Sequence, residues 1–230
     1  MAIGEKPNER EQRIRTLEAV IEGRRSIRQF KDSTVPKEDL FRIIRAAGLA
    51  PSAGNQQMWH FLLIRDKALT EEMRQAIFDA VDEMLTWEES QPYELRVRAI
   101  RSYATFFVNA PVTIAVLNKP FDSVIHSQVY PRQGLSFEQV YHRTGDPGKQ
   151  SLGAAIQNLL LMAHAMGYGT CWMTGPMVAT PALEKILRVE PPWQLAAIIA
   201  LGVPAEHPGP RPRKEVKDIC TFVDGEEHKE

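Results

Sequence analysis

The sequence has little of what marks a secreted, metal-binding or nucleic-acid-binding protein. Only two of its 230 residues are cysteine, Cys171 and Cys220, and they lie far apart. This excludes a disulfide framework and the paired spacing of a cysteine zinc site. The formal net charge is −1 and the six histidines are scattered, so no positive field attracts nucleic acid and no metal-ligand spacing appears. We therefore expect no metal, no nucleic-acid partner, and a reducing, cytoplasmic setting.

Long apolar runs and the common nucleotide and hydrolase motifs are also missing. No run is long enough to span a bilayer, and residues 1–6 lack the apolar segment of a signal peptide. The chain has no Gly-x-Gly-x-x-Gly between a strand and a helix, no P-loop and no Gly-x-Ser-x-Gly elbow. What remains is 43% hydrophobic and 25% charged, which is typical of a globular protein. The sequence predicts no membrane association.

Hydrophobic periodicity predicts one α+β or α/β domain. Residues 1–10 are polar and predicted to be loose. Helical spacing predicts helices at Glu11–Gly23, Pro36–Gly48, Thr70–Trp87 (with Thr70 as N-cap), Ser151–Met166 and a short one capped by Thr180. Apolar runs predict buried strands at Trp59–Ile64, Pro111–Leu117 and Leu195–Val203, and a short extended stretch at Thr170–Thr174. In this pattern Trp59 and Phe61 are core residues, and Cys171 is a packed thiol.

The middle of the chain, about residues 88–150, is the least regular part. Glu88–Tyr103 is charged and helical in propensity, whereas Asn118–Gln150 mixes prolines and glycines with four aromatic residues. A loop this long in a compact domain is either functional or disordered. The aromatic residues favour a lid or an interface arm, and a tolerated surface insertion with one short helix fits equally well.

A basic cluster follows the first predicted helix, in the stretch Gly23–Phe30. It places Arg24, Arg25, Ser26 and Arg28 within five positions. The planar fork of arginine donors matches phosphate and carboxylate oxygens, so the cluster could hold an anionic cofactor. On these residues alone, a solvated basic turn is an equally good reading.

Four segments in order carry a resemblance to a known family. They are Gly23–Phe30 (GRRSIRQF), Ala50–Phe61 (APSAGNQQMWHF), Ala154–Trp172 and Ile198–Pro204, the last followed by two arginines. Together they resemble the FMN-dependent nitroreductase family over about Leu17–Lys214, leaving residues 88–150 uncovered. Met58 departs from the pattern, where that family usually has proline.

The resemblance implies a single domain, 1–230, with a three-layer fold. Its central sheet would be mixed but mainly antiparallel, flanked by helices, in an intertwined homodimer with FMN at the interface. Residues 88–150 would form a lid or interface region, and about 205–230 a tail that binds the flavin phosphate. The implied cofactor-binding residues are Arg24, Arg25, Ser26, Arg28, Pro51, Ser52, Ala53, Asn55, Trp172, Met173, Thr174, Gly175, Arg211 and Arg213.

Each group of these residues has an implied role. Arg24, Arg25 and Ser26 would contact the phosphate and ribityl side, and Arg28 the polar edge of the ring, where a cation stabilises reduced flavin. The stretch from Pro51 to Asn55 would reach the partner's flavin, although Asn55 is also a residue that suits a left-handed turn. The stretch from Trp172 to Gly175 would lie along the ring, and the two tail arginines would complete the phosphate grip.

The implied function is that of an FMN-dependent oxidoreductase. NADH or NADPH would pass hydride to flavin N5, and an electron-poor acceptor such as a nitroaromatic or quinone would then take its place. No side chain is expected to act as acid, base or nucleophile, because the flavin carries the reaction. Two alternatives stay open: reductive dehalogenation or flavin fragmentation on the same fold, and a non-catalytic flavin-binding dimer. The resemblance specifies neither the natural acceptor nor the preferred nicotinamide.

Overall fold

The computed structural model describes residues 7–223 and contains one four-stranded sheet. Its strands are β1 (Trp59–Ile64), β2 (Val112–Asn118), β3 (Gly169–Met173) and β4 (Gln194–Gly202). They are ordered β1-β2-β4-β3, and every neighbouring pair is antiparallel. One isolated parallel bridge joins Ser26 to Thr170 at the β3 edge. The four strands therefore form an antiparallel sheet, in agreement with the mainly antiparallel sheet expected, and the parallel pairing is confined to this bridge.

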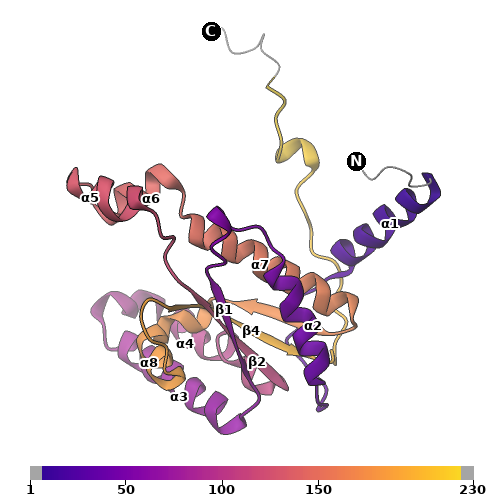
Figure 1. The fold of residues 1–230 in the computed structure, drawn as a ribbon. Coiled ribbons are helices and arrows are strands. Elements are labelled where there is room, and N and C mark those ends of the chain that lie inside the picture. The colour runs from indigo at the N-terminus through magenta and orange to yellow at the C-terminus, as the bar shows by residue number, and fades with distance from the viewer. Residues whose placement is uncertain (1–6, 224–230) are drawn as a thin grey trace.

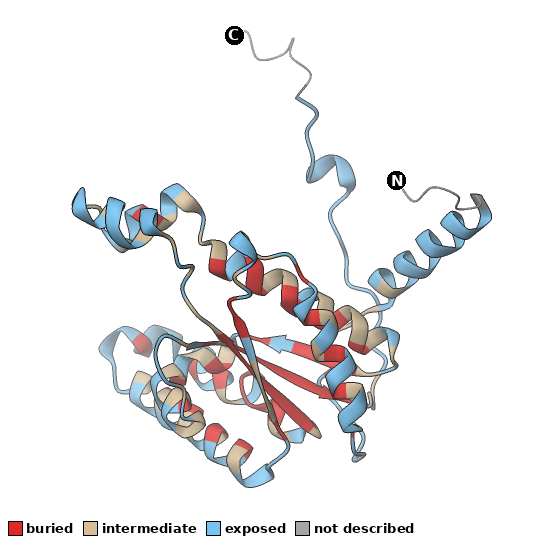
Figure 2. Ribbon diagram, viewed as in Figure 1, coloured by how far each residue is buried: buried red, intermediate tan, exposed pale blue. Residues whose placement is uncertain are grey.

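Helices cover both faces of this sheet and give three layers (Figure 1). One face carries α2 (Lys37–Gly48) and α7 (Pro147–Ala165), and the other carries α3 (Lys67–Leu85), α4 (Glu94–Tyr103) and α8 (Thr180–Leu187). The side chains of β4 alternate between the two cores, since Ile199 packs with the first cluster and Ile198 with the second. Figure 2 shows that burial concentrates in the strands and in the helix faces turned toward them.

Two ends of the chain and one arm project from this body (Figure 1). The projecting parts are α1 (Pro7–Gly23), the tail after β4 with η6 (Val216–Asp218), and an arm, residues 121–145, with η4 (Ile125–Val129), α5 (Tyr130–Arg132) and α6 (Phe137–Thr144). Shorter helical turns lie at η1 (Ala53–Asn55), η2 (Glu88–Tyr93), η3 (Phe106–Asn109) and η5 (Gly175–Ala179). Trp59 is buried and Phe61 packs against the same core, as predicted.

Three helix starts differ from the prediction. Residues 7–10, expected to be loose, belong to α1. Asp66, and not Thr70, caps α3: its carboxylate accepts from the backbone N–H groups of Ala68 at 2.8 Å and Leu69 at 3.3 Å, and Thr70 is buried one turn inside. Thr180 likewise lies inside α8 and donates to the Met177 carbonyl without capping the helix. α1 and α3 thus begin before the polar residue that seemed to start them, and α8 begins at Thr180 itself.

The segment Asn118–Gln150 contains more helix than the surface insertion with one short helix that was one of its two predicted forms. The arm holds η4, α5 and α6, and α7 starts at Pro147 and not at Ser151. A reciprocal capping box fixes the start of α6, because Ser136 and Gln139 each accept from the other's backbone N–H, at 3.3 and 2.8 Å. The Asp146 carboxylate caps α7 by accepting from the Lys149 N–H at 3.0 Å. Local capping therefore orders a stretch whose composition predicts irregular structure.

Candidate functional site

The stretch Gly23–Phe30, the arginine turn, runs along the free edge of β3. The Ile27 N–H donates to the Thr170 carbonyl at 2.9 Å, beside the Ser26–Thr170 bridge. The buried Ile27 side chain needs Gly169 opposite it, because a Cβ added to Gly169 would lie 2.7 Å from Ile27 Cγ1. The turn is thus held by the sheet and is no loose basic loop.

Backbone pairing and one carboxylate join the arginine turn to the start of the tail. The Lys31 N–H donates to Val203 O and the Ala205 N–H donates to Gln29 O, both at 2.9 Å. One carboxylate oxygen of Glu206 accepts from the backbone N–H groups of Arg28 and Gln29, at 2.5 and 3.1 Å. Glu206 therefore fixes the direction in which the tail leaves the sheet.

These contacts bring together arginines from the two ends of the sequence. A cavity of about 660 Å³, the arginine cavity, lies between the end of α1 and the tail and is lined by Arg24, Arg25, Arg211 and Arg213, together with Ala19, Ile21, Glu22, Gly23 and Pro210. Four guanidinium groups face one carboxylate, that of Glu22, so the lining is positive. The donor set suits a phosphate, which arginine binds through paired N–H groups.

The Arg25 side chain is also arranged in a way that suits an anionic ligand. Its Nη1 donates to the carbonyl oxygens of Glu22 at 2.5 Å and Arg24 at 2.9 Å, which holds the side chain in place. Its Nε is buried and has no partner among residues 7–223. A buried donor without a partner is costly, so an anion reaching it would be stabilised. The residues present therefore fit a phosphate-bearing cofactor.

Arg28 does not line the arginine cavity. Its guanidinium carbon lies 5.9 Å from the centroid of the Phe106 ring, and Nη1 donates to the Ser26 carbonyl at 3.3 Å. Cys171 lies on the neighbouring strand, buried as predicted, and burial raises the pKa of its thiol above the ordinary value, outweighing the lowering effect of Arg28. The structure thus separates Arg28, which was expected at the edge of the flavin ring, from the arginines expected to bind the phosphate.

The end of β3 offers one exposed aromatic side chain. The Trp172 side chain is 42% exposed, whereas that of Met173 is buried in the core. Thr174 is exposed, and Gly175 is placed so that an added Cβ would lie 3.1 Å from the Tyr103 ring. At Met173 and Gly175, therefore, a ligand beside Trp172 could contact the backbone but no side chain.

The predicted residues of the loop Pro51–Gln57, the Pro51 loop, lie away from these arginines. The Ala53 N–H donates to the Ser151 hydroxyl at 3.2 Å, near the start of α7. Gly23 meets the other end of α7, where an added Cβ would lie 2.8 Å from His164 Nε2. His164 lies thirteen positions after Ser151 in that helix, a separation of roughly 20 Å at about 1.5 Å per residue.

One chain therefore does not bring the two halves of the predicted site together. Within the Pro51 loop, Ser52 accepts from the Gln57 N–H at 3.0 Å, and Asn55 adopts a left-handed conformation with φ of 54°. That conformation agrees with a turn role for Asn55, and it leaves the role of the Asn55 side chain a prediction.

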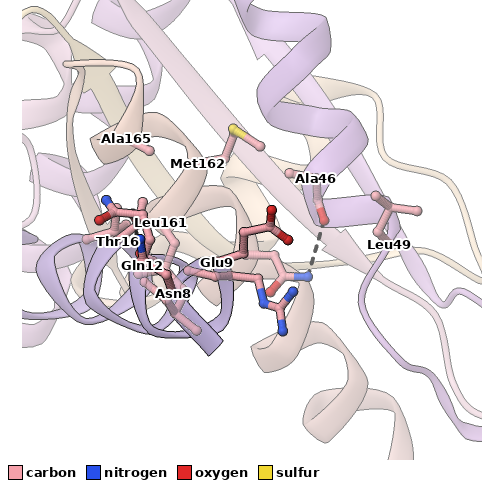
Figure 3. A pocket seen from close by; sticks show the side chains of 13 residues that line it. Asn8, Glu9, Gln12, Thr16, Ala46, Leu49, Leu161, Met162 and Ala165 are labelled. Atoms are coloured by element: carbon pink, nitrogen blue, oxygen red, sulfur yellow. Dashed lines mark hydrogen bonds between the residues drawn. The ribbon is translucent and has the colours of Figure 1, made fainter. Parts of the chain in front are cut away.

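A second cavity is an apolar groove lined in part by the same helix, α1 (Figure 3). This groove, of about 960 Å³, separates α1 from α2 and α7, with Leu17 and Val20 on one side and Leu49, Leu161 and Met162 on the other. The Asn158 side chain, also in the lining, donates to the Ala46 carbonyl at 3.2 Å. The groove is too apolar for a phosphate, so it is no candidate for the cofactor site.

Residues 7–223 contain no cluster of three or more potential metal ligands among His, Cys, Asp and Glu. Within the same residues, no helix combines the length and apolar character needed to cross a membrane.

The sequence of residues 21–203 matches the family model of the nitroreductase family. The chain belongs to the nitroreductase family. A putative NADH dehydrogenase/NAD(P)H nitroreductase of Methanothermobacter thermautotrophicus is 32% identical over 200 residues, which is 85% of this chain and 80% of the relative. The 5,6-dimethylbenzimidazole synthase of Rhodospirillum rubrum is 29% identical over 205 residues, 84% of this chain and 85% of that one.

Solved structures agree with this membership. A BluB-like flavoprotein from Clostridium difficile superposes with a TM-score of 0.78 at 33% identity, covering 90% of this chain and 99% of the other. An iodotyrosine deiodinase bound to FMN and 3-iodo-L-tyrosine shares the fold, with a TM-score of 0.64 at 22% identity, covering 87% and 96%. The protein is therefore an oxidoreductase of the nitroreductase family, built on the fold that the resemblance implied.

Sequence reasoning missed two residues that hold the site together. Glu206 forms a hydrogen bond with the arginine turn, 178 positions away in the sequence, and Gln56 forms one with the arm, 66 positions away. Glu206 lies outside the four family segments, and Gln56 lies within one of them but was assigned no role, so only the three-dimensional arrangement identifies these contacts.

Proposed function

We propose that the protein is an FMN-dependent NAD(P)H oxidoreductase that reduces electron-poor acceptors such as nitroaromatics and quinones. The observation that carries the proposal is the arginine cavity, which is lined by Arg24, Arg25, Arg211 and Arg213. Within residues 7–223 the buried Nε of Arg25 has no hydrogen-bond partner. The names of the relatives support flavin and nicotinamide chemistry. FMN, when bound, supplies hydride transfer between a nicotinamide donor and the acceptor.

The chain's own residues would bind and orient that cofactor. The four arginines of the cavity would hold its phosphate, with Ser26 beside them. Arg28, which stands apart on Phe106, would balance negative charge on the ring edge when the cofactor is reduced. Trp172 and the backbone from Met173 to Gly175 would lie along the ring. The proposal assigns no side chain the role of acid, base or nucleophile.

The active unit would be a homodimer that shares each site. The Pro51 loop and the arginine turn contact opposite ends of α7, so Pro51, Ser52, Ala53 and Asn55 would complete the site of the partner subunit. An exposed apolar stripe on α1, at Ile14, Leu17 and Ile21, and exposed tail residues from Val216 to Val223 support such an association. The apolar groove beside α1 would then be covered by the second copy.

This arrangement agrees with a single domain over residues 1–230, in which about 205–230 would be the flavin-binding tail. Residues 224–230 of that tail lie outside the described part of the chain. The arm would belong to the lid or interface region. Both cysteines are free thiols, which agrees with the cytoplasmic location that we propose.

The test is cofactor retention and turnover in matched variants. The purified wild type should be yellow, should elute as a dimer, and should oxidise NADH or NADPH with a quinone. Arg213→Ala should raise the Kd for FMN about tenfold, the loss of one charge-assisted contact. Lys217→Ala, further along the exposed tail, is the control and should bind FMN as the wild type does. A protein that stays colourless after refolding with FMN refutes the proposal.

Flavin fragmentation is the second candidate, because two of the similar proteins are a 5,6-dimethylbenzimidazole synthase and a BluB-like flavoprotein. Aerobic incubation of the FMN-loaded protein with NADPH, followed by mass spectrometry, distinguishes the two. Release of 5,6-dimethylbenzimidazole would establish fragmentation, and acceptor-dependent turnover without it would establish the reductase. Bound flavin that neither nicotinamide reduces would instead favour a non-catalytic flavin-binding dimer.

A further inference from the structure

The first part of the arm contains a cluster of aromatic rings around one histidine. His126 packs against Phe121 and Tyr130, with ring centroids 5.3 and 6.1 Å away and both rings nearly perpendicular to the imidazole, at 87° and 85°. Both ring nitrogens of His126 are buried, and neither has a hydrogen-bond partner among residues 7–223. A neutral imidazole has one donor and one acceptor, so both hydrogen-bonding groups of this side chain are unused.

The backbone under His126 is also unusual. It belongs to η4, a π-helical turn (Ile125–Val129), a rare conformation that occurs frequently at functional sites. Ile125 and Val129 on the same turn are 48% and 44% exposed, so the turn is covered on one side only. A small outward movement would therefore expose the imidazole to an incoming molecule.

The histidine cluster is fastened to the Pro51 loop. The Gln56 amide N–H donates to the Asp122 carbonyl at 2.6 Å, and the Asp122 N–H donates to the Gln56 side-chain oxygen at 2.9 Å. A Cβ added to Gly54 would lie 3.7 Å from Phe121 Cε2, so the ring rests on the loop backbone. The cluster must therefore move with the loop that we assign to the partner's flavin.

The loop side of this contact is strained as well. Asn55 and Gln57 flank Gln56 with φ of 54° and 47°, a conformation that costs energy for residues other than glycine. Such strain gathers at ligand sites, where the surrounding structure holds it in place. Strained loop, π-helical turn and unpaired imidazole thus meet at one junction.

We propose that His126 determines which acceptors the protein reduces, by donating a hydrogen bond to an oxygen substituent of a planar aromatic acceptor bound against the arm. The inference rests on the proposed function, since it assigns a role at the same shared site. Phe121 and Tyr130 supply ring surfaces for a flat substrate. Buried polar groups left unpaired in the free protein favour ligands that pair them and reject analogues that do not.

The experiment compares acceptors that need the His126 hydrogen bond with one that does not. Acceptor kcat/KM is measured with 4-nitrobenzoate, 1,4-benzoquinone and ferricyanide, for the FMN-loaded wild type, His126→Phe and His126→Gln. His126→Phe should lower kcat/KM about tenfold for both aromatic acceptors, as expected for the loss of one hydrogen bond. It should leave ferricyanide unchanged. His126→Gln keeps a donor and should recover most of the loss, and His142→Gln, at an exposed histidine of the same arm, is the matched control.

A second measurement needs no activity. Because phenylalanine removes two unpaired nitrogens at similar ring volume, His126→Phe should raise the Tm by roughly 2–4 °C, measured with and without FMN. An equal loss of kcat/KM with ferricyanide and with the aromatic acceptors would overturn the assignment. An unchanged kcat/KM for the aromatic acceptors together with a lower Tm would overturn it as well.

Two further outcomes keep the inference separate from the proposed function. Should His126→Phe fail to fold, Gln56→Leu removes both hydrogen bonds between Gln56 and Asp122. It must then lower kcat/KM for the aromatic acceptors and leave that for ferricyanide unchanged. Equal effects on the two kinds of acceptor overturn the proposal. Should the wild type bind no FMN, the proposed function is refuted. The Tm comparison without cofactor then still decides whether the His126 nitrogens are unpaired.

Discussion

Replacing Glu206 tests whether one carboxylate sets the geometry of the arginine cavity. Glu206→Ala removes an oxygen that accepts from two backbone N–H groups of the arginine turn, at 2.5 and 3.1 Å. Hydrogen bonds to a charged group contribute more than neutral ones, but Glu206 is only half-buried, so solvent screens the interaction. We expect a loss of about 1–2 kcal/mol in the free energy of unfolding, which lowers the Tm by roughly 2–8 °C for a chain of this size.

The same substitution should weaken the cofactor, because the tail that carries Arg211 and Arg213 leaves the sheet at Glu206. The Kd for FMN, measured by quenching of flavin fluorescence, should rise about tenfold, which corresponds to about 1.4 kcal/mol. Glu206→Gln keeps a neutral acceptor oxygen and should give an intermediate value. Glu215→Ala is the control, since that side chain does not cap the turn that follows it. A lower Tm with an unchanged Kd would refute the reasoning, because the tail arginines would then not depend on the Glu206 anchor.

Three further predictions concern single side chains. Arg28→Ala should slow flavin reduction by NAD(P)H in stopped-flow by on the order of tenfold or more, while the Kd for FMN changes less than the rate; the opposite result makes Arg28 an ordinary anchor. Burial, and then the hydrogen bond to Asp39, raise the pKa of Tyr168 to about 12. The stability that this tyrosine contributes is therefore fully present below its ordinary pKa of about 10 and is lost as the pH rises through about 12. In denaturant titrations from pH 9 to 12, the free energy of unfolding should fall less steeply with pH for Tyr168→Phe than for the wild type. In the native protein iodoacetamide should label the exposed Cys220 and spare Cys171, whose burial raises its pKa; equal labelling would contradict the buried position.

The sequence predicts the elements whose hydrophobic pattern is strong. β1, β4 and the long α7 were expected within a few residues of where they lie, because continuous apolar runs and a helical period leave few alternatives. The starts of α3 and α8 were wrong because a threonine at the edge of each apolar pattern resembled a cap. The helices within the arm were not predicted, although Ser136 and Gln139 carry the spacing of a capping box, since the surrounding glycines and prolines suggested irregular structure.

The candidate site was predictable only where residues lie together in sequence or match a family motif. Arg24, Arg25, Arg211 and Arg213 were named in this way, and the fold places these four residues around one cavity. Glu206 and Gln56 could not be identified, because each acts through a contact with a distant backbone segment. The cost of an unpaired His126 is likewise invisible in a sequence, because it depends on what surrounds the ring.

The composition of the arginine cavity has a consequence for biosynthesis. Arg24 and Arg25 precede all four strands of the sheet, whereas Arg211 and Arg213 follow the last strand, β4. The cavity cannot close while the ribosomal tunnel still holds the tail, however early the sheet has formed. A nascent chain would thus fold much of its core before the cavity could retain a phosphate.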